Sequence, residues 1–222
     1  MISLIVPSYG RPERLKVMLD SACDTAIDLP DYRVMVEKFD PRLADYGDDV
    51  DAGNYGSSSQ AWLAGFRTAH DFGHLSCFHM AADDLVYMTP GWDQTVLAAM
   101  PRGKAWVIQH RDNFRDDKQF CTPFMSREFL ELCNFMPWHP GLKHFYTDTW
   151  IEDVARRAEC WTYLPDVLIE QRHYKNHLAP RDATYDRPRD GPTWAHDDQL
   201  FNQYLSVIDR ESFARKIKEF NK

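Results

Sequence analysis

Short apolar runs alternate with segments of helical periodicity through the first half of this sequence. The runs 2–6, 32–36, 75–82 and 105–108 are short and apolar and predict buried strands. Residues 12–22, the segment after the serines 57–59, and the segment from Trp92 to about Met100 repeat apolar residues at helical spacing. Alternating strands and helices favour a mostly parallel α/β sheet with helices on both faces.

The second half is less regular. Ser126 precedes one predicted helix, and a strand is expected at 167–170. Thr149 and Glu152 have the spacing of a capping box, which would start a helix there and leave Asp148 just outside its N-terminus. Residues 180–192 are rich in Asp, Arg and Pro and predict a mobile loop, followed by helices at about 197–208 and 210–220. We expect one domain over 1–222, divided into 1–110, 111–179 and 180–222.

Composition narrows the function classes. The 222 residues carry a net charge of −8, which argues against a general binder of polyanions such as nucleic acid. A local basic groove would have to use the only clustered basic candidates, Arg111, Arg115, Lys118, Arg181, Arg187 and Arg189. The five cysteines show no C-x-x-C spacing and predict reduced thiols. Neither a signal peptide nor a transmembrane stretch is indicated, so we expect a cytoplasmic protein without a membrane partner.

Polar side chains follow several of the predicted strands. Arg11, Glu37, Asp83 and His110 all come at strand exits, and the carboxyl ends of parallel strands share one edge, where ligands bind. Asp83 and its neighbour Asp84 can serve different partners, because adjacent side chains diverge. Such a pair suits a hard divalent cation that takes its remaining ligands from substrate phosphates and water, although a solvated acidic turn would show the same two residues.

Four segments in this order resemble the GT-A glycosyltransferases, especially the inverting group similar to family 2. They are I-S-L-I-V-P-S-Y-G-R-P-E-R-L at 2–15, A-D-D at 82–84, Y-T-D-T-W-I-E-D at 146–153 and I-E-Q-R-H at 169–173. The resemblance runs from the N-terminus to about residue 177. It departs from the family pattern at Ala82, which takes the first position of the D-x-D motif, and at the second strand, which ends E-K-F-D instead of in a double Asp.

The resemblance implies a Rossmann-like GT-A fold and a nucleotide-sugar donor whose sugar moves, with inversion, to an acceptor hydroxyl. Residues 1–110 would bind the donor, and 111–179 would form the irregular acceptor and catalytic half. The implied donor-binding residues are Pro7, Tyr9, Arg11, Glu37 (with Asp40 as its alternative), Ser57 and Asp83. Asp84 would bind Mn²⁺ or Mg²⁺, with His173 as second ligand, and His favours Mn²⁺. Asp148 would be the catalytic base.

Two other classes stay open at this point. A nucleotidyltransferase on a similar sheet would usually carry a glycine-rich loop after its first strand, where this sequence has P-S-Y-G-R. A non-catalytic nucleotide-sugar-binding module would bind the donor without turning it over. The acceptor can be a glycan, a small molecule, a protein or a hydroxylated nucleobase.

Overall fold

The computed structural model describes residues 1–186 and 192–222, except for the side chains of residues 70, 204 and 205. Eight strands form a mixed sheet in the order β3-β2-β1-β4-β7-β6-β8-β5. Their bounds are β1 (Ile2–Ser8), β2 (Asp31–Glu37), β3 (Asp51–Gly53), β4 (Cys77–Met80), β5 (Leu85–Tyr87), β6 (Val107–Arg111), β7 (Phe124–Ser126) and β8 (Trp161–Gln171). Strands β1, β2, β3, β4, β6 and β8 run in one direction, while β5 and β7 are antiparallel to their neighbours.

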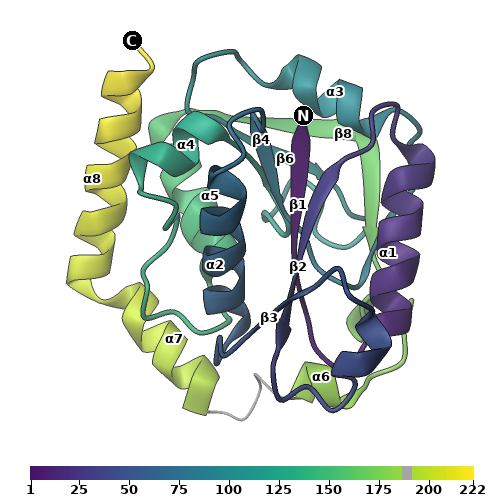
Figure 1. The fold of residues 1–222 in the computed structure, drawn as a ribbon. Helices are drawn as coiled ribbons and strands as arrows, with labels where there is room; N and C mark the ends of the chain where they lie inside the picture. The colour runs from purple at the N-terminus through teal and green to yellow at the C-terminus, as the bar shows by residue number, and fades with distance from the viewer. Residues whose placement is uncertain (187–191) are drawn as a thin grey trace.

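Helices cover both faces of this sheet (Figure 1). They are α1 (Pro12–Thr25), α2 (Ser58–His70), α3 (Trp92–Ala99), α4 (Arg127–Leu132), α5 (Thr147–Ala158), α6 (Ala183–Asp186), α7 (Pro192–Asn202) and α8 (Tyr204–Phe220). Two short 3-10 helices, η1 (Leu43–Tyr46) and η2 (Tyr174–Asn176), lie in the connecting segments.

The side chains of β1 point alternately into two hydrophobic cores, one on each face of the sheet. Leu4 and Val6 belong to the core shared with α1 and α3, whereas Ile5 belongs to the core shared with α2, α4, α5 and α8. Successive side chains of a strand point to opposite faces, so a fully apolar strand must be covered on both. The approach of α2 is close: a Cβ at Gly65 would lie 2.4 Å from a methyl carbon of Ile5. A glycine is therefore needed at position 65 for this helix to reach the sheet.

The predicted α/β sheet with helices on both faces is confirmed, with local differences. Strands β3, β5 and β7 were not predicted, because three-residue strands are too short to show a period. The last two helices break near Gln203 and not between 208 and 210. The predicted loop at 180–192 contains α6, and its residues 187–191 lie outside the described part of the chain.

A helix that spans a bilayer needs about 20 predominantly apolar residues. Among the described residues, no helix has the length and apolar character needed to span one.

Candidate active site

A pocket of about 940 Å³ lies where β1, β2 and β4 end. Its lining includes nine residues for which the sequence predicts a site role: Pro7, Tyr9, Arg11, Glu37, Ser57, Asp83, Asp84, Asp148 and His173. They come from segments separated by more than a hundred positions, and the fold brings them to one cavity. Their individual roles remain predictions.

The loop after β1 is held by a buried hydrogen-bond network. The Ser8 hydroxyl donates to Asp83 Oδ2 at 2.8 Å, and Arg11 Nη1 lies 3.2 Å from Asp83 Oδ1. The Tyr46 hydroxyl accepts the Arg11 backbone N–H at 2.9 Å, lies 3.1 Å from Ser8 Oγ and donates to Asp40. Arg11 is the N-cap residue of α1, and the proline after it starts the helix as predicted. The network therefore fixes this loop against Asp83.

Glu37 and its alternative Asp40 both bind backbone groups. The two carboxylate oxygens of Glu37 accept the N–H groups of Tyr55 and Gly56 at 3.1 and 2.7 Å, which holds that loop beside the pocket. Asp40 accepts the Gly10 N–H at 2.7 Å and is not part of the pocket lining. Glu37 therefore faces the cavity while Asp40 supports the loop behind it. Ser57 is the N-cap of α2, as predicted, and accepts the N–H of residue 60.

Asp84 is buried with one oxygen unsatisfied. Its Oδ2 accepts a hydrogen bond from the Tyr185 hydroxyl at 3.1 Å, whereas Oδ1 has no hydrogen-bond partner among the described residues. Burial, and then the neighbouring charge of Asp83, raise the pKa of Asp84 to about 6. Burial also raises the pKa of Asp83, although Arg11 opposes this. A buried, unpaired carboxylate oxygen is costly in isolation and suits a cation-binding role.

The metal site implied by the resemblance fits Asp84 better than His173. In the described part of the chain, no three His, Cys, Asp or Glu side chains gather as a ready metal site. That is consistent with a cation held by one or two carboxylates and by substrate oxygens. His173 lines the same pocket, but its Nδ1 accepts the Lys175 N–H at 3.1 Å. A metal-binding histidine normally keeps its proton on the other ring nitrogen, so coordination through Nε2 would break this bond.

Asp148 lies within the first turn of α5, and the predicted capping box is wrong. The helix starts at Thr147, two residues before the expected cap, because Tyr146 adopts a left-handed conformation (φ 66°) that turns the chain into it. Glu152 accepts the Phe120 N–H at 3.2 Å and so is occupied elsewhere. Asp148 Oδ2 lies 3.1 Å from Arg115 Nη1, and burial raises the Asp148 pKa although Arg115 opposes this. Of the carboxylates in 146–153, only Asp148 lines the pocket.

Other sequence candidates lie outside the cavity. His110 is fully buried within β6 and bonds to Thr122, so the expectation that it joins the ligand-binding edge is wrong. No continuous basic groove is evident among the described residues: Arg115 pairs with Asp148, and Arg181 pairs with Asp186. Two further candidates for that groove, at 187 and 189, lie outside the described residues.

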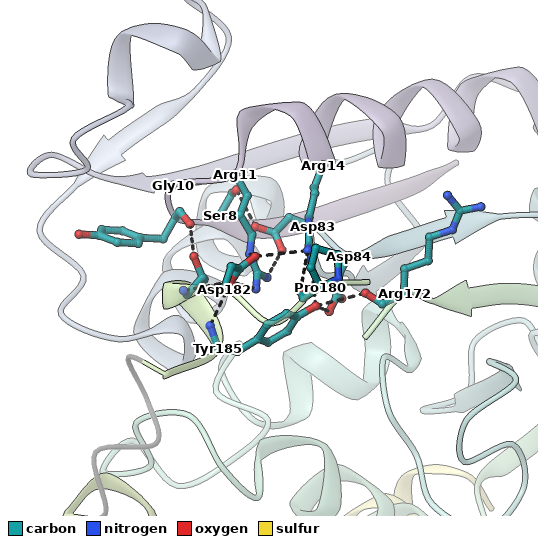
Figure 2. Close-up of polar contacts among 12 residues, drawn as sticks. Ser8, Gly10, Arg11, Arg14, Asp83, Asp84, Arg172, Pro180, Asp182 and Tyr185 are labelled. Carbon is teal, nitrogen blue, oxygen red and sulfur yellow. Dashed lines mark hydrogen bonds and ion pairs between the residues drawn. The ribbon is translucent and has the colours of Figure 1, made fainter. Parts of the chain in front are cut away.

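The sequence interpretation missed the segment that covers this end of the pocket. Asp182, just before α6, forms ion pairs with Arg11 and Arg14, and Tyr185 bonds to Asp84 (Figure 2). Thr184 donates to the Tyr9 carbonyl at 2.9 Å. No local sequence signal marks these residues, since a polar segment rich in Asp, Arg and Pro reads as a loop.

Comparisons with known proteins find similarity in structure and not in sequence. No protein-family model and no curated protein sequence matches the chain. A mannosyltransferase from Pyrobaculum calidifontis, solved with GDP-Man and Mn²⁺, is similar with a TM-score of 0.59 and 12% identity over 99% of this chain and 69% of that one. Glucosyl-3-phosphoglycerate synthase from Mycobacterium tuberculosis, solved with Mn²⁺, UDP-glucose and phosphoglyceric acid, is similar with a TM-score of 0.59 and 10% identity over 96% of this chain and 80% of that one.

TarS from S. aureus (residues 1–349), solved with UDP, gives a TM-score of 0.57 and 12% identity over 97% of this chain and 70% of that one. At these identities the comparisons establish the fold. The chain has the GT-A fold that the sequence resemblance implied.

Proposed function

We propose that this protein is a metal-dependent glycosyltransferase that moves a sugar from a nucleotide-sugar donor to an acceptor hydroxyl with inversion. The observation that carries the proposal is the pocket itself: the Asp83/Asp84 pair, Arg11 and Asp148 all line one cavity at the carboxyl ends of the parallel strands. Structures with the same fold hold UDP, or a sugar nucleotide with Mn²⁺.

The donor half would use the loop after β1 and the acidic pair. Arg11 is positioned by Asp83 and by the Tyr46 network, so its guanidinium can meet the donor's phosphates. Asp84 offers the unsatisfied Oδ1 for Mn²⁺ or Mg²⁺. When bound, such a cation supplies charge stabilisation for the departing nucleoside diphosphate.

The acceptor half would use Asp148 as general base. Its carboxylate takes the proton of the acceptor hydroxyl while that oxygen bonds to the anomeric carbon and the bond from that carbon to the phosphate oxygen breaks. The electron pair of the broken bond leaves with the nucleoside diphosphate. Partial burial and the raised Asp148 pKa favour proton uptake, and Arg115 at 3.1 Å keeps the carboxylate ionised before the reaction.

Incubation with a panel of UDP- and GDP-sugars and Mn²⁺ tests this function, with release of nucleoside diphosphate as the readout. We expect slow hydrolysis of one donor without an acceptor. Asp148→Asn should cut turnover by about 100-fold or more while leaving donor affinity nearly unchanged. Asp153→Asn is the matched control, because Asp153 lies on the same helix outside the pocket and pairs with Arg157 and Arg210.

Two results would contradict parts of the proposal. Tight binding of a sugar nucleotide without any turnover, across many acceptor hydroxyls, would favour a binding module. Normal turnover in Asp148→Asn together with an inactive Asp153→Asn would show that the base is misassigned.

A further inference from the structure

We propose that Asp182 is a built-in competitor of the donor's diphosphate, and that it must leave Arg11 and Arg14 before the donor can bind. This inference rests on the proposed function and adds a regulation of the same site. Neither Asp182 nor Arg14 was assigned a role by the resemblance.

Arg11 is a buried cation with two carboxylate partners. Only 7% of its side chain is exposed, and it contacts Asp83 at 3.2 Å on one side. On the other side Asp182 binds it with both oxygens, at 3.1 Å from Nε and 2.6 Å from Nη2. This two-point geometry matches how a guanidinium holds a carboxylate or a phosphate.

A second arginine, Arg14 of α1, shares the Asp182 carboxylate with Arg11. Arg14 Nη2 lies 3.3 Å from Asp182 Oδ2, one helical turn along from Arg11. Two guanidinium groups thus converge on one anion beside Asp83 and Asp84 (Figure 2). Asp83 is buried behind Arg11, whereas Asp182 is 33% exposed and comes from a separate segment. Of the two carboxylates, Asp182 is the one that an incoming anion can replace.

Residues 182–185 also contact Asp84, through Tyr185. The Tyr185 hydroxyl bonds to Asp84 Oδ2, and its ring lies under the Arg11 guanidinium at 3.9 Å. The other oxygen of Asp84 is shielded from solvent. Tyr185 therefore occupies one of the two Asp84 oxygens while residues 182–185 keep these contacts, and a cation at Asp84 would compete with that hydrogen bond. Release of Asp182 would free the arginines and Asp84 together.

A charge-only substitution isolates this role. Asp182 Oδ1 also accepts the N–H groups of Thr184 and Tyr185, and asparagine supports such a turn about as well as aspartate. Asp182→Asn should therefore keep α6 in place while weakening the contacts of the residue-182 side chain with Arg11 and Arg14. Asp186→Asn is the matched control, since Asp186 is the last residue of α6, the helix that follows Asp182, and pairs only with Arg181 among the described residues.

Calorimetric titration with UDP, GDP and inorganic pyrophosphate, each with Mn²⁺, tests the proposal. We expect Asp182→Asn to bind the preferred probe about three- to tenfold more tightly than the wild type, as befits removal of a partly exposed ion pair. Asp186→Asn should match the wild type. Equal or weaker binding by Asp182→Asn would overturn the proposal and favour a closed segment that the donor needs.

Amide hydrogen exchange supplies a second readout that needs no variant. Nucleoside diphosphate with Mn²⁺ should speed exchange at residues 182–185 of the wild type if the segment is displaced. Slower exchange there would overturn the proposal. Failure of all three proteins to bind any probe would instead contradict the proposed glycosyltransferase function.

Discussion

Removing the Asp197 carboxylate should loosen the loop that leads into α5. Asp197 in α7 is fully buried, and its oxygens accept the backbone N–H groups of Lys143, His144 and Phe145 at 2.9–3.2 Å. Its own neighbour His196 adds a fourth contact at 2.9 Å. The loop lines the pocket and runs directly into α5. One side chain therefore ties this wall of the pocket to α7.

The expected cost follows from these contacts. A hydrogen bond to a charged group contributes roughly 1.5–3 kcal/mol, and the freed N–H groups can partly recover by binding water. Asp197→Ala should therefore lower the free energy of unfolding by about 3–5 kcal/mol. For a chain of this size, that corresponds to a fall in Tm of about 6–20 °C. Thermal and urea unfolding of the variant measure it.

Two comparisons check the reasoning on Asp197. Asp198→Ala is the control, because Asp198 is only half-buried and bonds to the Tyr146 hydroxyl and to the exposed Asn202 but, among the described residues, to no backbone N–H. Its partners can bind water instead, so the loss should cost about 1 kcal/mol or less. Burial raises the pKa of Asp197, but hydrogen bonds from His196 and the loop outweigh this and lower it overall. The pKa of Asp197 is thus lower in the folded protein than in the unfolded protein, where it is about 4. Its ionised carboxylate stabilises the fold above that pH, and this stabilisation is lost as pH falls through the folded-state pKa. The difference between wild type and Asp197→Ala should thus shrink in acid, and a Tm loss below about 3 °C would refute the account.

Three further predictions concern metal binding, the loop after β1 and pH. Asp84→Asn should abolish Mn²⁺-dependent binding of nucleoside diphosphate in calorimetry, and unchanged binding would remove the metal site from Asp84. Tyr46→Phe deletes the hydroxyl that accepts the Arg11 N–H, so unfolding free energy should fall by about 1–3 kcal/mol and donor affinity should fall with it; a fully stable variant with normal affinity would contradict this role. Burial, and then His110, lower the pKa of His79 well below its ordinary value. The neutral, buried His79 contributes stability above its unfolded pKa of about 6.5, and this contribution is lost as pH falls below that value. In urea titrations below pH 6, the unfolding free energy of the wild type should therefore fall by up to about 1.4 kcal/mol per pH unit more than that of His79→Gln. Equal pH dependence of the two proteins would contradict this.

Residues at strand exits could be found from the sequence because their position follows from local pattern. Asp83 and Asp84 come just after a short apolar run, and Arg11 precedes a proline that starts a helix. Parallel strands then bring such exits to one edge whatever the details of packing. His110 shows the limit of that reasoning: β6 continues through it, and its side chain is used inside the core.

Asp148 was assigned to the pocket for a partly mistaken reason. The sequence pattern of Thr149 and Glu152 was read as a helix start, yet the left-handed Tyr146 begins the helix earlier. A capping pattern describes only local hydrogen-bond options, and Glu152 instead binds the backbone of Phe120, 32 positions away. The position of Asp148 beside the cavity depends on that tertiary arrangement.

The sequence alone determined the α/β alternation, the helices that begin at Pro12 and at Ser57–Ser59, and the edge at which polar side chains gather. These depend on periodicity and turn chemistry within a few residues of each position. Only the tertiary structure decided what covers that edge. Asp182 reaches Arg11 across 171 positions of the chain. No local pattern encodes such a pairing, because it exists only once the sheet has formed and the C-terminal segment has folded back over its edge.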